Sequence, residues 1–130
     1  MFGVILDDVT YNLRVKFGTI GRSFRIEDGP NASNMLSGLY KRDIIGTYYD
    51  YSMEIEQDPN NPSVYDQFYE AISAPVDSHK LILPYGQGLI TFDAMVTGGS
   101  DYYRGKIANV SRWNELQVQF TAQKPQREPT

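Results

Sequence analysis

The chain has 130 residues, a hydrophobic share of 41% and a net charge of −4. This length fits one domain with one core, and the apolar share excludes a wholly disordered chain because it can offset the entropy of ordering the backbone. No basic cluster of the kind that neutralises phosphates occurs, so we expect no direct nucleic-acid binding, and the absence of cysteine excludes disulfides and thiolate chemistry.

The first eight residues carry about five apolar side chains before two aspartates, with no basic region and no small-residue cleavage site. We therefore expect no secretion signal and synthesis in the cytoplasm. The longest apolar run elsewhere is far shorter than the roughly 20 residues that a membrane helix needs, so we expect no membrane insertion.

Alternation of apolar and polar side chains predicts two strands in the first half. Residues 11–17 place apolar side chains on one face and polar ones on the other, as a strand with one buried face does. Residues 47–57 repeat this pattern, with tyrosine, methionine and isoleucine at the odd positions from 49 to 55.

A helix is predicted at about residues 63–73, after a proline-rich turn. Ser63 is the expected N-cap, with Asp66 three residues on as a variant of the capping box, and Pro75 ends the helix. Apolar side chains recur at positions 64, 68 and 72, so we expect this stripe to lie on the sheet.

The C-terminal half predicts a meander of strands. We expect strands at 80–83 and 89–97, a hairpin turn at 98–100, and a further strand from 101 to 110. Trp113 opens the last strand, which closes a single domain at about residue 122. Residues 123–130 are a polar tail that we expect to fray or to dock on a neighbour.

Residues 28–42 fit neither a strand nor an ordinary solvent-exposed loop. Glycine, proline, asparagine and serine disfavour a strand there, whereas Met35, Leu36, Leu39 and Tyr40 are too apolar for water. About fifteen residues without clear structure is long for a compact domain, and such loops are often functional.

No residue pattern predicts a catalytic, cofactor or metal site, and we expect no enzyme and no cofactor. Asp77, Ser78 and His79 are consecutive, so an extended chain points them to opposite faces and they cannot converge as a triad. We expect His79 at the surface or at a strand end. Glu54 and Glu56 share a strand face and could in principle act as the carboxylate pair of a glycoside hydrolase. The polar face of any half-buried strand carries such pairs, however, so we expect no such activity.

Ten tyrosines are available for the core or for an interface. Alternation assigns about half of them to an apolar face. Tyr48, Tyr102 and Tyr103 are less easily explained by a core and are interface candidates, because tyrosine offers apolar area together with a polar group.

The order of these elements carries a family resemblance. The run 42–47 leads into the strand that ends at Glu56, followed by the helix, the strand at 80–83, the meander and the closing strand around 113–118. Over roughly residues 20–122 this order resembles short tail and baseplate proteins of bacteriophages and prophages, as a pattern of strands with few fixed residues.

The resemblance implies a mainly β fold, a β-sandwich or partly closed antiparallel barrel with one short flanking α-helix. It also implies a non-enzymatic virion structural protein that forms homo-oligomeric rings or an adaptor with other tail or baseplate proteins. In such proteins a long loop between early strands reaches a neighbouring subunit, and 28–42 occupies that place. This loop is short for a full tail-tube hairpin, so tube, baseplate and adaptor roles stay open.

We expect the apolar residues of this loop to pack on the next subunit while edge strands pair across the interface. The expected anchors are Met35, Leu36, Leu39 and Tyr40, with Arg42 and Asp43 fixing the register through charge pairs. The alternative is a carbohydrate- or receptor-binding β-sandwich that uses exposed tyrosines and Trp113. An enzyme that depends on His79 or Glu54 ranks last.

Overall fold

A computed structural model describes residues 2–16, 18–34 and 36–129. The described chain is mainly β with one helix, which confirms the fold class predicted from the sequence. Seven strands form one antiparallel sheet in the order β2-β1-β7-β8-β9-β6-β3, and β4 and β5 form a second, small sheet. The elements are β1 (Phe2–Leu6), β2 (Val9–Val15), β3 (Gly21–Asp28), β4 (Ser33–Asn34), β5 (Tyr40–Lys41), β6 (Ile44–Glu56), α1 (Pro62–Ile72), β7 (His79–Tyr85), β8 (Gly88–Ile107) and β9 (Val110–Ala122).

The large sheet is partly closed and is not a complete barrel. Strand β2, at one end of the sheet order, pairs with β1. It also meets β6 through two residue pairs, Arg14 with Glu56 and Val15 with Ile55. The contact of β1 with β7 is equally short. The sheet therefore curls around one apolar face without a continuous ring of long ladders.

The core lies on the concave face of this sheet, where alternate side chains of six strands point inward. Helix α1 covers that face with Tyr65, Phe68 and Ile72. Phe68 is fully buried and meets the ring of Tyr11 edge to face at 5.4 Å. The buried residues of the sheet are Val4, Leu6, Leu13, Tyr51, Met53, Ile55, Leu81, Leu83, Phe92, Ala94, Leu116, Val118, Phe120 and Ala122.

The start of α1 differs from the expected capping box. Pro62 is the first helical residue, where its missing N–H costs nothing, so Asn61 takes the N-cap position. The Asn61 side chain does not cap a backbone N–H of the helix; its Oδ1 accepts from Ser63 Oγ at 3.0 Å. The predicted cap by Ser63 with Asp66 is therefore wrong.

The predicted hairpin turn at residues 98–100 is also wrong, because β8 continues through it to Ile107. The glycines lie at irregularities of the β8–β9 ladder, with register shifts between Val96 and Gly99 and again beyond Ser100. The true turn is Ala108–Asn109, whose φ angles of 53° and 65° suit a two-residue hairpin. A glycine within a strand pattern is compatible with a β-bulge as well as with a turn, so the sequence does not distinguish the two.

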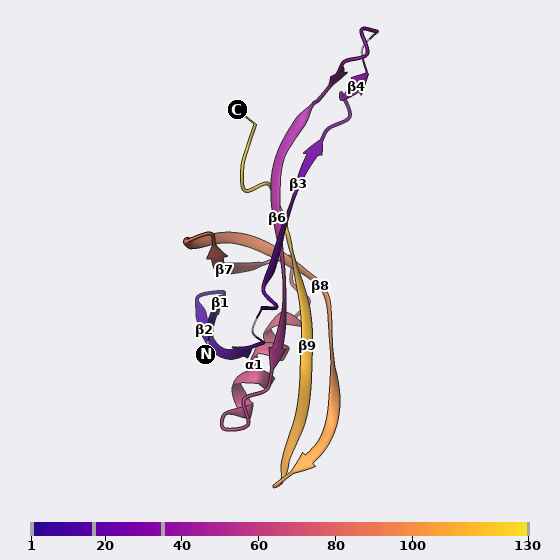
Figure 1. Ribbon diagram of the computed structural model, residues 1–130. Coiled ribbons are helices and arrows are strands. Elements are labelled where there is room, and N and C mark those ends of the chain that lie inside the picture. The colour runs from indigo at the N-terminus through magenta and orange to yellow at the C-terminus, as the bar shows by residue number, and fades with distance from the viewer. Residues whose placement is uncertain (1, 17, 35, 130) are drawn as a thin grey trace.

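Two hairpins reach beyond the core at opposite ends of the molecule (Figure 1). We call residues 21–49 the β3–β6 arm and residues 100–115 the β8–β9 arm. The segment 28–42, expected as a loop, is the end of the β3–β6 arm, where Ser33 pairs with Lys41 and Asn34 with Tyr40. The expected loop is thus an extended hairpin.

The described part of the C-terminal tail docks on its own chain. Tyr49 N donates to Gln126 Oε1 at 2.9 Å, Gln126 Nε2 donates to Tyr49 O at 3.1 Å, and Thr47 N donates to Arg127 O at 2.8 Å. A Cβ atom at Gly46 would come within 2.6 Å of Pro125 Cβ, so the tail's close approach needs glycine there.

The attachment of α1 to β8 is testable at Tyr65. Its hydroxyl donates to Asp101 Oδ2 at 2.8 Å, and burial together with this carboxylate raises the pKa of the phenol. We expect Tyr65→Phe to lower the free energy of unfolding by about 1 kcal/mol in urea titrations. Tyr69→Phe, an exposed tyrosine on the same helix, should change it by less than about 0.5 kcal/mol. Equal effects of the two substitutions would contradict this role.

Candidate assembly interface

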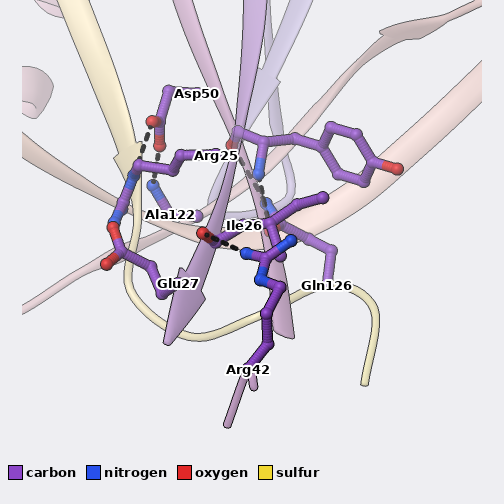
Figure 2. Close-up of polar contacts among 8 residues, drawn as sticks. Arg25, Ile26, Glu27, Arg42, Asp50, Ala122 and Gln126 are labelled. Carbon is purple, nitrogen blue, oxygen red and sulfur yellow. Dashed lines mark hydrogen bonds and ion pairs between the residues drawn. The ribbon is translucent and has the colours of Figure 1, made fainter. Parts of the chain in front are cut away.

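Polar contacts fix the root of the β3–β6 arm (Figure 2). Arg25 Nε donates to Asp50 Oδ2 at 2.9 Å and Nη1 to Glu27 Oε1 at 2.7 Å, and both bonds raise the pKa of Arg25. The other oxygen of Asp50 accepts from Ala122 N at 3.0 Å, and the guanidinium lies 4.4 Å from the ring centre of Tyr48. Because these contacts join β3, β6 and the end of β9, the arm leaves the core in a defined direction.

Arg42 and Asp43 close the outer part of the arm on itself. Arg42 Nε donates to Asp28 Oδ1 at 3.0 Å and Nη2 to Ile26 O at 3.3 Å, while Asp43 Oδ2 accepts from Asn31 N at 3.2 Å. Figure 2 shows the bond of Arg42 to Ile26. These bonds stiffen the arm from within, and the expected charge pairs with a neighbouring subunit stay a prediction.

The far end of the arm presents apolar side chains to solvent. Leu36 is wholly exposed, Leu39 is largely exposed and Tyr40 is about half exposed. The fourth expected anchor, Met35, lies outside the described residues. The structure thus brings three of the expected anchors to one protruding tip.

More apolar side chains lie along the arm than the sequence analysis assigned to it. Phe24 is 68% exposed, and Ile26, Ile44 and Ile45 are exposed as well. Phe24 pairs with Tyr49 and therefore shares its face, which farther along β6 is the face of the core. The core face of the sheet continues uncovered into the arm. Phe24 and Ile26 alternate with charged residues in the sequence, and this alternation could have predicted β3.

The three candidate tyrosines are far apart. Tyr48 is half buried beneath Arg25 in the β3–β6 arm, whereas Tyr102 and Tyr103 are exposed on the β8–β9 arm at the other end of the molecule. The Tyr103 ring lies 5.0 Å from the ring of Trp113. The predicted interface residues therefore form two separate surfaces.

His79 is the first residue of β7, a strand end as expected, but it is buried. His79 Nδ1 donates to Asp7 Oδ2 at 2.6 Å, and Lys80 N donates to Asp7 Oδ1 at 2.9 Å. Burial alone would raise the pKa of Asp7, but these two hydrogen bonds outweigh it and lower the pKa. The pair ties the β1–β2 turn to β7, and neither Asp77 nor Ser78 takes part in this contact.

Within the described ranges, no group of three histidine, aspartate or glutamate side chains could hold a metal ion. Among the residues that the structure describes, no helix is long and apolar enough to cross a membrane.

No protein-family model matches this sequence, and no curated protein matches it. The resemblance to phage tail and baseplate proteins stays a prediction from the order of the elements in the sequence.

The buried contact of His79 gives a prediction at Asp7. We expect Asp7→Asn to lower the free energy of unfolding by about 1–2 kcal/mol at pH 7, because buried His79 loses a charged acceptor. Since the pKa of Asp7 is lowered in the folded state, its contribution is present above the ordinary value of 3.8 and is lost as pH falls through the lowered pKa. The difference between the two proteins should therefore shrink in acid.

Asp8→Asn is the matched control, measured by the same denaturant titrations across pH. Asp8 has a φ of 67°, similar to the 51° of Asp7, but its side chain pairs only with Lys80 at the surface and not with a buried group. We expect a change below about 0.5 kcal/mol. A larger loss from Asp8→Asn than from Asp7→Asn would overturn the assignment.

Proposed function

We propose that this protein is a non-enzymatic structural subunit of a phage or phage-like tail or baseplate and acts in the virion. The observation that carries the proposal is the β3–β6 arm, which projects from the core, is braced by its own ion pairs and exposes apolar side chains. A braced arm of this kind suits docking on a neighbouring copy or on another tail protein. The arm also agrees with the resemblance, in which a segment between early strands reaches the next subunit.

The exposed apolar area of the arm is large enough for a specific interface. Seven apolar residues contribute: Phe24, Ile26, Leu36, Leu39, Tyr40, Ile44 and Ile45. If each exposes on the order of 100 Å², the arm offers about 700 Å², close to the roughly 800 Å² that one partner buries in a standard protein interface. This area is spread along the arm and lies on both of its faces, because Ile44 and Ile45 are adjacent in β6.

Strand β3 adds a second mode of attachment, because it is the edge strand of the large sheet. An edge strand offers backbone N–H and C=O groups to which another chain can add a strand. A contact from the arm of one copy to a different surface of the next is heterologous, and such contacts close into a ring when the rotation per subunit closes.

Oligomeric state tests the proposal directly. We expect light scattering across a concentration series to show a ring-sized oligomer of the unaltered chain. The double substitution Leu36→Asp and Leu39→Asp should weaken assembly by at least about a hundredfold, because two buried leucines contribute about 3 kcal/mol or more.

Leu89→Asp is the control, since Leu89 is also largely exposed but lies near the β7–β8 turn, away from the tip of the arm (Figure 1). It should leave the mass unchanged. A strict monomer at all concentrations would rule out self-assembly and leave an adaptor that binds only another protein. An oligomer that survives the double substitution would overturn the anchor assignment.

A second candidate function is binding of a carbohydrate or receptor by the β8–β9 arm. The favouring observation is that exposed Tyr103 lies against Trp113, with Tyr102 exposed beside it in the chain. Aromatic rings suit such ligands because they combine apolar area with a polar group. Glycan binding by a monomer, lost in Tyr103→Ala, would favour this function over assembly.

A further inference from the structure

A recess of about 400 Å³ lies along the β8–β9 arm, where the arm faces Arg14 of β2 and the end of β6. Three arginines line it, Arg14, Arg104 and Arg112, together with Glu56 and Glu115. Its size falls within the range of small-ligand sites. The five charged residues come from four separate stretches of the chain, so the fold alone brings them together.

The charges of the recess are only partly matched within the chain. Arg14 Nε lies 4.0 Å from Glu56, and Glu115 has a partner in Lys16 at 3.8 Å. Arg104 and Arg112 have no carboxylate within 4.0 Å among the described residues. Arg112 Nε is also enclosed without a hydrogen-bond acceptor in the described part of the chain. A buried donor without a partner is rare in proteins, and a bound water or ligand can satisfy it.

Hydrogen bonds hold the walls of the recess in place. The buried amide of Gln57 donates to Ser111 O at 3.1 Å and accepts from Trp113 N at 3.4 Å, which joins the end of β6 to β9. Glu115 has a φ of 57°, a strained conformation for a residue with a side chain. Such strain is concentrated at functional sites, where the surrounding structure maintains it.

The charge balance selects the ligand. Three arginines and two glutamates give the lining a net charge of +1, which a single negative charge neutralises. A nucleic-acid backbone or a phosphate dianion would bring excess charge close to Glu56 and Glu115. A carboxylate is a monoanion that matches the planar guanidinium group, and Ile107 and Pro59 in the lining can contact its carbon stem.

We propose that this recess binds one carboxylate group through Arg104 and Arg112. The carboxylate belongs either to an acidic side chain of a partner protein or to a free small carboxylic acid. Arg14 remains with Glu56 at the rim. The site is separate from the β3–β6 arm and does not depend on the proposed assembly role.

Titration followed by NMR tests the site, with the Arg Nε–H signals as the readout. The probes are acetate and the peptide acetyl-Gly-Glu-Gly-amide. We expect a saturable shift of the Arg112 Nε–H signal, with Kd values of about 1–10 mM for acetate. Arg104→Gln and Arg112→Gln should each weaken binding by about tenfold, whereas Lys106→Gln, on the same hairpin but outside the lining, should not.

The two probes also separate the sources of the carboxylate. Binding of the peptide tenfold tighter than acetate would assign the recess to a protein segment, and equal affinities would assign it to a free acid. A shift that does not saturate, equal binding by folded Arg104→Gln protein, or tighter binding of inorganic phosphate than of acetate would overturn the proposal. Because Arg104 is exposed, its substitution keeps the test valid even if Arg112→Gln fails to fold.

Discussion

The structure depends on a mismatch of length between the strands and the helix that covers them. The 11 residues of α1 span about 16 Å, whereas the 20 residues of β8 span up to about 66 Å. One short helix can seal only the middle of such a sheet. The long strands must therefore leave the core, and their apolar faces reach solvent in the two arms.

The arms are consequently part of the sheet and not loops attached to it. The ladder of β3 with β6 runs without a break from Gly21 to Glu27, and ion pairs of Arg25 and Arg42 brace it on either side. The C-terminal tail lies along β6 where β9 ends, so the strand keeps a partner on that side. An arm supported in this way loses little conformational entropy when a partner covers it.

Sequence reasoning succeeded where one local pattern decides the outcome. The alternation around Met53 and Val118 and the stripe of α1 are local signals, and the structure follows them. It failed where a signal has two meanings, as Gly98 and Gly99 fit a bulge as well as a turn. It also failed where distant residues meet. The exposed leucines of the arm tip were readable from composition, but the pairing of Arg42 with Asp28 and the gathering of Arg14 with Arg104 are products of the fold.

The placement of β1 bears on how fast the chain can fold. Ile5 pairs with Ile82, so the sheet is complete only after a long segment has closed, whereas the hairpin of β8 and β9 can form from neighbours in sequence. Contacts so distant in sequence are typical of slow-folding β proteins. Until β1 and β2 arrive, β7 lacks a partner on one side and the core is open to water. We expect the docking of the N-terminal hairpin to be a late step in folding.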